Sequence, residues 1–240
     1  MTGNKYFIGL DIGGTNTRGI LYDGKKIIKS REVKTPQNEN SFAKKIREII
    51  AELSRGKNIA SIGIGSAGVV ENTALLFSPN IPAVKNFDFR KIAPSGVSLK
   101  VDNDARCFAR GEYRFGVGKK FKSIFVITIG TGIGRAYVKN GKVQNIKKLE
   151  YPEKWEKEYQ YIRDRGSDAE LIILLADKLA DLIISYRPEA VILGGGVISR
   201  KNLFVKLKNA IKKNGMNAPI LKSSLGKHSA ALGAALLFSR

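Results

Sequence analysis

The sequence predicts an α/β protein, and three observations carry that prediction. Apolar runs of strand length alternate with segments whose apolar residues recur at helical spacing. Three of the apolar runs pass directly into clusters of glycine, near residues 13, 130 and 194. The 240 residues suffice for one large domain, or for two lobes with a buried core.

Each element follows from its local pattern. Apolar runs bounded by glycine or by Asp-Gly and Asn-Gly turns predict strands, and apolar residues three and four apart predict helices. Two prolines predict a loop over residues 75–89. In chain order the predicted elements are strands over about 5–35, a helix over 41–54, strands over 60–65 and 99–101, a helix over 105–115, a hairpin over 123–138, a helix over 167–186, a strand over 190–193, and helices over 202–213 and 229–238.

The first glycine cluster joins two apolar strands. The run 6–10 ends on Asp11 and is followed by Gly13, Gly14 and Thr15, before a second apolar run returns over 19–22. Backbone N–H groups in such a turn are unshielded by side chains and suit the oxygens of a phosphate. Asp11 is placed to hold the Mg²⁺ that accompanies a nucleotide. A β-turn that needs glycine for positive φ is the alternative, and this motif alone leaves both interpretations open.

A similar device occurs twice more. The strand 126–129 runs into a glycine and threonine cluster over 130–134, and the strand 190–193 runs into Gly194–Gly196. Three such transitions favour a nucleotide site over three unrelated turns. The prediction is two phosphate-binding hairpins and a glycine-lined nucleoside slot between two lobes.

These motifs resemble the ROK family (repressors, open reading frames and sugar kinases) of the actin-like ATPase superfamily. Residues 11–15 are similar to its first phosphate motif, residues 130–134 to the second, and residues 192–197 to the adenosine motif. Four further segments follow in the family's order, with Ala67 in place of the usual proline: 63–70, 78–82, 101–105 and 225–235. The resemblance spans nearly the whole chain, with a gap at about residues 143–166.

The resemblance implies a two-lobed actin-like ATPase (ribonuclease H-like) fold with a nucleotide cleft between the lobes. The N-terminal lobe would comprise residues 1–102 and the C-terminal helix 229–240, and the C-terminal lobe residues 103–228. The implied activity is ATP-dependent phosphorylation of a hydroxyl on a sugar, with ATP and Mg²⁺ as cofactors. A homodimer is also implied, because members of the family commonly associate.

The resemblance also assigns roles to residues. Asp104 would be the general base, Asn103 would hold a neighbouring hydroxyl, and Asp11 would position Mg²⁺ through water. For Asp102 and Asn103 a helix N-cap is a serious alternative. The other implied substrate ligands are Asn80, Gly68 and Glu150. The implied nucleotide ligands are Asp11, Gly13, Gly14, Thr15, Asn16, Gly130, Thr131, Gly132, Gly194, Gly195 and Gly196.

The chain departs from the family's pattern after the second phosphate motif. Many members carry a Cys-rich zinc motif and a Gly-Glu-Ile-Gly-His segment there, and this chain has neither. With a lone Cys107 and a lone His228, no zinc site is expected. We expect His228 to be structural or to lie near the nucleotide.

Several side chains keep two interpretations each. Glu150 or Glu153 either replaces the lost glutamate or is a surface carboxylate beside lysines. Trp155 either stacks on a sugar ring or packs in the core. Arg18 and Arg135, beside the phosphate hairpins, either contact phosphate or face solvent. Asn80 either faces the sugar or caps its own turn.

The composition and charge of the chain limit the kinds of partner that we expect. The formal net charge is +21, but no basic run is interleaved with aromatic residues, so no specific nucleic acid is expected. No apolar stretch reaches the ~20 residues of a membrane span, and a single cysteine fits the reducing cytoplasm. The expected partners are therefore ATP and a small sugar. A kinase of a non-sugar alcohol and a non-catalytic sugar- or nucleotide-sensing homologue are the alternatives.

Overall fold

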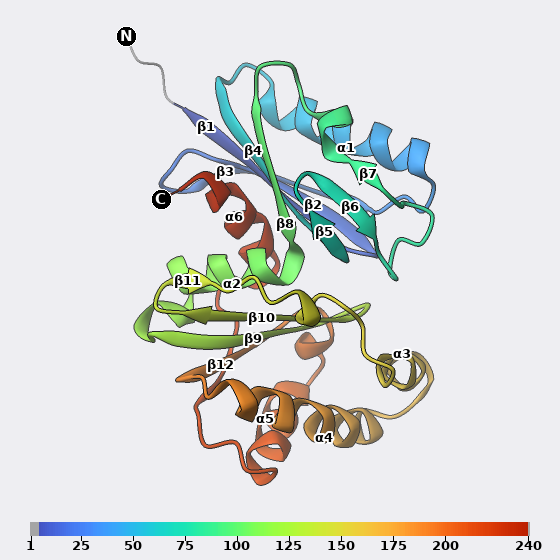
Figure 1. Cartoon of the computed structure of the whole chain (residues 1–240), viewed down its shortest axis with the longest axis vertical. Helices are drawn as coiled ribbons and strands as arrows, with labels where there is room; N and C mark the ends of the chain where they lie inside the picture. Colours follow the sequence, from blue (N-terminus) through green and yellow to red (C-terminus); the bar gives the residue numbers. More distant parts are fainter. Residues whose placement is uncertain (1–4, 240) are drawn as a thin grey trace. The chain divides into compact units, whose positions relative to one another are not determined.

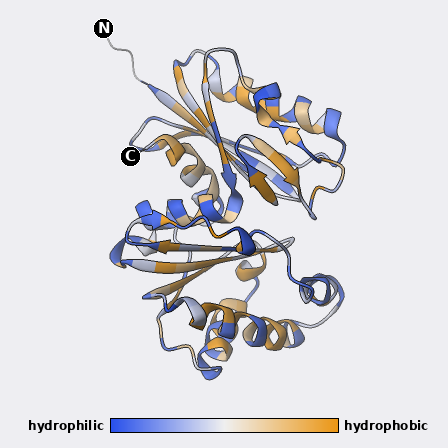
Figure 2. Ribbon diagram, viewed as in Figure 1, coloured by the Kyte–Doolittle hydropathy of each residue, from blue (hydrophilic) through white to orange (hydrophobic). Residues whose placement is uncertain are grey.

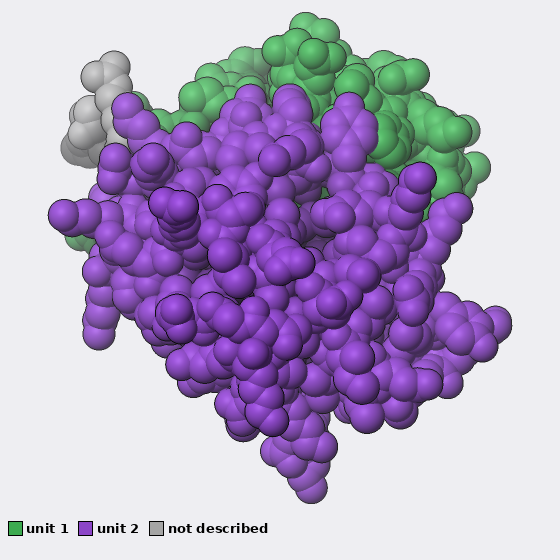
Figure 3. Space-filling model, turned by 60° about the horizontal axis from the view of Figure 1, so that its bottom comes forward, with its two compact units in different colours: residues 1–111, 227–240 green, residues 112–226 purple. Residues whose placement is uncertain are grey.

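The computed structural model describes residues 5–239 and divides into two compact units. Unit 1 comprises residues 1–111 and 227–240, and unit 2 comprises residues 112–226, as coloured in Figure 3. The division after Gly111 lies beyond the lobe boundary expected after Asp102. The reason is close packing of the helix that follows Asp102 on the C-terminal helix: a Cβ atom built on Gly233 would lie 1.7 Å from the carbonyl oxygen of Cys107.

Unit 1 is built on a five-stranded sheet of order β3-β2-β1-β4-β8. β1 is antiparallel to β2 and parallel to β4, which is parallel to β8. Ile12, Ser66 and Asn103 are neighbours across these three parallel strands, so the strands end at one edge of the sheet. The strands are β1 (Tyr6–Ile12), β2 (Asn16–Tyr22), β3 (Ile27–Lys34), β4 (Ile59–Ser66) and β8 (Ser98–Asn103).

Two helices cover the two faces of this sheet (Figure 1). α1 (Glu39–Ser54) begins after an Asn38 N-cap and buries a continuous apolar stripe against the sheet. α6 (Ser229–Ala235) approaches the other face so closely that a Cβ atom on Gly63 would lie 1.8 Å from the carbonyl oxygen of Ala234. The short η5 (Gly226–His228) and η6 (Leu236–Phe238) flank α6.

A small antiparallel sheet occupies part of the segment predicted as a loop. It consists of β5 (Val69–Glu71), β6 (Ala74–Phe77) and β7 (Phe87–Asp88), followed by η1 (Phe89–Ile92). The loop prediction over 75–89 was therefore wrong at both of its ends. Pro79 and Pro82 lie between β6 and β7, where neither has to donate a ladder hydrogen bond.

α2 (Asp104–Arg114) follows β8 directly, and the boundary between the units falls within it. Unit 2 contains a second five-stranded sheet, of order β11-β10-β9-β12-β13. β9 and β10 form a hairpin, and β12 is parallel to β9, with Gly194 opposite Thr128. The strands are β9 (Ser123–Ile129), β10 (Ile133–Lys139), β11 (Lys142–Val143), β12 (Ala190–Gly194) and β13 (Ile220–Lys222).

The core of unit 2 lies between this sheet and two helices. α4 (Asp168–Tyr186) starts in a capping box of Ser167 and Glu170, and with α5 (Leu203–Lys213) it supplies most of the helical core residues. α3 (Glu156–Arg165) was not predicted and is mostly hydrophilic (Figure 2). The short helices of this unit are η2 (Val117–Lys120), η3 (Lys147–Leu149) and η4 (Val197–Ser199).

Of the helices in residues 5–239, none is long and apolar enough to cross a membrane.

Candidate nucleotide and catalytic site

Residues 13–15, called phosphate loop 1 after the motif that they resemble, join β1 to β2, and each of their carbonyl oxygens accepts a hydrogen bond. Thr35 Oγ1 donates to the oxygen of Gly13 at 2.7 Å, Gln37 Nε2 to that of Gly14 at 2.9 Å, and the Thr35 amide to that of Thr15 at 3.0 Å. The C=O and N–H of a trans peptide point in opposite directions. The amides of residues 14–16 are therefore directed away from the donors. This is the arrangement that phosphate binding by backbone amides requires.

Asp11 precedes this loop on β1 and lies opposite Arg18 on β2. Its Oδ2 is 3.6 Å from Arg18 Nη1. Burial, reinforced by the negative charge of Asp104, raises the pKa of Asp11 to about 7, although Arg18 opposes the shift. A buried carboxylate beside a second negative charge is a favourable place for a divalent cation.

Asp11 is a residue that could hold the Mg²⁺ of a nucleotide. Among residues 5–239 there is no group of three or more His, Cys, Asp or Glu residues that could hold a metal ion. Mg²⁺ binds through one or two carboxylates and keeps waters and substrate phosphates as its other ligands. Asp11, beside phosphate loop 1, meets that requirement.

Asp104 is the first residue of α2, directly after the strand end at Asn103. The Asn103 side chain caps the helix, because its Oδ1 accepts from the amides of Ala105 at 3.0 Å and Arg106 at 3.3 Å. Its Nδ2 donates to the carbonyl oxygen of Gly68 at 2.9 Å. Asn103 is therefore the N-cap of α2, as the alternative interpretation expected. Its side-chain amide is fixed at the edge of the sheet where β1 leads into phosphate loop 1.

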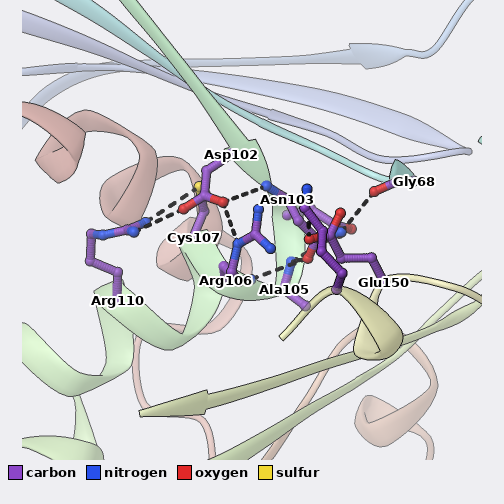
Figure 4. A network of polar contacts seen from close by, with 10 residues as sticks. Gly68, Asp102, Asn103, Ala105, Arg106, Cys107, Arg110 and Glu150 are labelled. Atoms are coloured by element: carbon purple, nitrogen blue, oxygen red, sulfur yellow. Dashed lines mark hydrogen bonds and ion pairs between the residues drawn. The ribbon is translucent and has the colours of Figure 1, made fainter. Parts of the chain in front are cut away.

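Asp102 anchors the turn from β8 into α2 (Figure 4). Its carboxylate accepts hydrogen bonds from Arg106 Nε and, at 2.8 Å, from Arg110 Nη2. The backbone amide of Asn103 also donates to this carboxylate, at 2.9 Å. Arg110 also approaches Cys107 Sγ at 3.8 Å. Burial raises the pKa of Cys107 well above its ordinary value, so this thiol is unreactive. The network ties the end of β8 to the first turns of α2, the helix that Asp104 begins.

The loop between β6 and β7 (residues 78–86), called the Asn80 loop, packs on phosphate loop 1. A Cβ atom on Gly14 would lie 2.5 Å from the Cβ atom of Asn80, and the Asn80 amide donates to Ser78 Oγ at 3.3 Å. Unit 1 thus brings Asn80, Gly68 and Asn103 to the neighbourhood of phosphate loop 1 and the start of α2.

Phosphate loop 2, residues 130–132, joins β9 to β10 in unit 2. Tyr159 Oη donates to the carbonyl oxygen of Gly130 at 2.5 Å, and Arg163 Nη1 donates to the oxygens of Gly130, at 3.2 Å, and of Thr131. Burial raises the pKa of Tyr159 to about 12, so the phenol stays protonated as a donor. The amides of Thr131 and Gly132 therefore point away from α3, which supplies the donors to this loop.

The third glycine cluster lies beside phosphate loop 2. Gly194 ends β12, and Gly195 has φ +95°, a conformation that favours glycine. A Cβ atom on Gly195 would also lie 2.3 Å from the carbonyl oxygen of Ile129, the residue before phosphate loop 2. Gly195 and Gly196 are exposed, and a Cβ atom on Gly196 would meet nothing within 4 Å. Unit 2 therefore exposes glycine backbone next to phosphate loop 2.

The two arginines beside the hairpins have carboxylate partners in the structure. Arg18 pairs with Asp11 and with Glu32 Oε1, the latter at 3.1 Å. Arg135 is 2% exposed and donates to Glu156 at 2.5 Å and to Glu153 at 2.7 Å. The prediction that Arg135 contacts phosphate or faces solvent was wrong, because carboxylates from a later segment enclose it.

The segment that replaces the family's zinc and substrate motifs is packed into unit 2. Glu150 is buried and pairs with Lys147 at 3.4 Å, so the surface-carboxylate alternative was wrong for it. Glu153, which is 48% exposed, accepts from Trp155 Nε1 at 2.9 Å. Trp155 packs against the unit 2 core, as the packing alternative expected. In unit 1, burial lowers the pKa of His228, which favours its neutral form.

Sequence reasoning missed the residues that hold the two phosphate loops. Thr35 and Gln37 stand at the end of a strand, where polar residues are common, and nothing in their spacing marks them. Tyr159 and Arg163 stand four apart in a highly charged segment, and that spacing places them on one helix face. This spacing was the available signal, but the sequence does not show what that face contacts.

Comparison with known proteins is consistent with this geometry. The model of the ROK family matches residues 7–145 and 168–240. A glucokinase of Thermotoga maritima is 36% identical over 141 residues, which are 56% of this chain and 44% of that enzyme. The matched part thus spans less than half of the glucokinase.

Two solved structures have similar folds over nearly their full length. A ROK family glucokinase from Streptomyces griseus, in complex with glucose and AMPPNP, has a TM-score of 0.80 at 24% identity, covering 96% of this chain and 98% of that one. An inorganic polyphosphate/ATP-glucomannokinase from Arthrobacter has a TM-score of 0.80 at 28% identity, covering 97% and 98%. The fold is therefore that of the ROK sugar kinases, and the chain belongs to the ROK family.

Proposed function

We propose that this protein is an ATP-dependent kinase that phosphorylates a hydroxyl group of a sugar, with Asp104 as the general base. One observation carries the proposal: unit 1 presents an amide-rich loop and the interacting carboxylates of Asp11 and Asp104 at one edge of its sheet. Similar proteins support it, since they include glucokinases and a glucomannokinase.

Phosphoryl transfer asks little covalent chemistry of a protein. It requires an attacking hydroxyl aligned with the γ-phosphate, a base for the hydroxyl proton, and neutralisation of phosphate charge. In this proposal Asp104 accepts that proton. The second hydrogen of the Asn103 amide donates to a neighbouring hydroxyl, because the first is held by Gly68.

The two phosphate loops bind the β- and γ-phosphates through amides whose carbonyl partners are already held. Glycines 194–196 accommodate the nucleoside. Asp11 holds Mg²⁺ through water, and that ion supplies charge neutralisation at the phosphates when bound. The Asn80 loop, against phosphate loop 1, and Glu150 complete the proposed set of substrate ligands.

A second acceptor class has one observation in its favour. The family match is interrupted over residues 146–167, shortly after β11, which follows the second phosphate hairpin. The Gly-Glu-Ile-Gly-His segment of many family members, which this chain lacks, is expected in this region. A non-sugar alcohol is therefore the alternative acceptor, and a sensor that binds without turnover is the alternative to an enzyme.

A panel of sugars and polyols with ATP and Mg²⁺ tests the proposal. Release of ADP together with a phosphorylated sugar is the expected result. ADP release with polyols alone would move the acceptor to the second class. Nucleotide and sugar binding without ADP release for any acceptor would overturn the kinase in favour of the sensor.

A further inference from the structure

We infer that Tyr159 and Arg163 of α3 are positioning residues that hold phosphate loop 2 in the orientation that binds the β- and γ-phosphates. The inference rests on the proposed function and adds two residues that the sequence motifs do not include. Arg163 makes more contacts with the loop than Tyr159 does, because its Nη1 donates to two successive carbonyl oxygens, those of Gly130 and Thr131.

The geometry of the peptide group links these contacts to the nucleotide. A carbonyl oxygen held on the α3 side fixes the plane of its peptide, and the N–H of that peptide then points to the opposite side. Two successive planes are fixed in this way, which directs the amides of Thr131 and Gly132. The hydrogen bond from the Gly130 amide to the Gly132 oxygen, at 3.0 Å, closes the turn.

Simple charge attraction by Arg163 does not explain the arrangement. Its Nε and Nη2 each donate to the Asp164 carboxylate at 2.7 Å, so a neighbouring acid offsets its charge. The remaining nitrogen, Nη1, is the one directed at the loop. Donation from a charged group to a carbonyl also polarises the peptide and strengthens its N–H as a donor. Arg163 therefore acts through the loop's own amides.

α3 is fastened at both of its ends. At the start, Arg135 Nη2 donates to Glu156 at 2.5 Å and to the Tyr151 carbonyl oxygen at 2.9 Å. At the end, Arg200 Nη2 donates to the carbonyl oxygen of Arg163 at 2.9 Å, while Arg200 Nη1 pairs with Asp168 at 2.8 Å. A helix held this way provides a rigid support for the loop.

The whole of α3 lies in the interval 146–167 that the family model leaves unmatched. The support of phosphate loop 2 is thus contributed by this chain's own segment, whereas the loop itself belongs to the matched part. In this inference α3 contributes to nucleotide binding by supporting phosphate loop 2, although residues 146–167 contain none of the family's nucleotide-binding motifs.

Binding of AMPPNP and of AMP by the full-length protein, measured by calorimetry, tests the inference. Arg163→Met should weaken AMPPNP about 10- to 100-fold, the range for losing hydrogen bonds from a charged donor, and leave AMP within about twofold. Tyr159→Phe keeps the buried ring and should weaken AMPPNP about three- to tenfold. Arg163→Lys should recover part of the loss, since one ammonium reaches a carbonyl but lacks the planar fork.

Arg165→Met is the matched control. Arg165 lies on the same helix, is exposed and carries the same charge, and its guanidinium lies over the Tyr161 ring rather than at the loop. Its removal should leave both affinities unchanged. With AMPPNP bound, faster hydrogen exchange at the amides of residues 131–132 in Arg163→Met than in the unaltered protein would support positioning.

Three results would overturn the inference. They are equal AMPPNP affinities for Arg163→Met and Arg165→Met, equal losses of AMP and AMPPNP binding in Tyr159→Phe, and no AMPPNP binding by the unaltered protein. The proposed kinase fails separately: if no acceptor is phosphorylated but Arg163→Met selectively weakens AMPPNP, the kinase falls and the positioning role stands.

Discussion

Breaking the buried ion pair of Arg135 with Glu156 should lower the stability of unit 2. The Arg135 side chain is 1% exposed and that of Glu156 is 8% exposed, so Arg135→Met leaves a carboxylate buried without its cation. Removing one partner of a buried pair costs about 3–5 kcal/mol. Glu156 keeps a hydrogen bond from the Glu153 amide at 2.9 Å, which places the expected loss at the lower end.

A loss of about 3 kcal/mol corresponds to a fall in melting temperature of roughly 10 °C for a chain of this size. Differential scanning calorimetry at neutral pH measures it. The double variant Arg135→Met, Glu156→Gln removes both charges and should recover more than half of the fall. Lys157→Met, an exposed residue of the same helix, should melt with the unaltered protein. A fall below 2 °C for Arg135→Met, or a double variant less stable than the single one, would refute the reasoning.

Two further predictions concern unit 1. Thr35→Val should raise the KM for ATP about fivefold or more. The substitution removes the donor to the Gly13 carbonyl oxygen and the hydrogen-bond partner of the buried Thr17 hydroxyl. Steady-state kinetics measures the KM, and an unchanged value would contradict the prediction. The hydrogen bond from the Arg90 side chain lowers the pKa of Asp88 to about 2, so its stabilising effect is complete above about pH 4 and is lost as the pH falls toward 2. Asp88→Asn should therefore unfold more easily in urea at pH 6, and its difference from the unaltered protein should shrink by more than half at pH 2. A difference as large at pH 2 as at pH 6 would argue against this.

Much of the fold could be predicted because its signals are local. The strands that lead into the three glycine clusters, the helix over 41–54 and the helix over 167–186 carry their periodicity and caps within a few residues. β6 and β7 were hidden because they are only short strands on either side of two prolines. α3 was hidden because Glu156 and Tyr159 are its only buried residues, too few for an apolar stripe.

The candidate site divides in the same way. The turns called phosphate loops 1 and 2 could be located in the sequence because apolar strands run directly into glycine and threonine there. Their supports could not, since Thr35 reaches the Gly13 carbonyl across 22 positions and Arg163 reaches that of Gly130 across 33. Arg135 was misjudged for a similar reason: its carboxylate partners come 18 and 21 residues later. Such contacts depend on tertiary structure, and one sequence carries no pattern for them.

The role of Asp104 is the central claim, and Asp104→Asn tests it most directly. The substitution keeps the size and a polar oxygen at the first position of α2 and removes the base. Single-turnover phosphoryl transfer, with AMPPNP affinity measured alongside, separates chemistry from binding. We predict a rate reduced by at least about 10²-fold with AMPPNP affinity within about threefold of the unaltered protein. Transfer at the full rate would contradict the assignment of Asp104 as the general base.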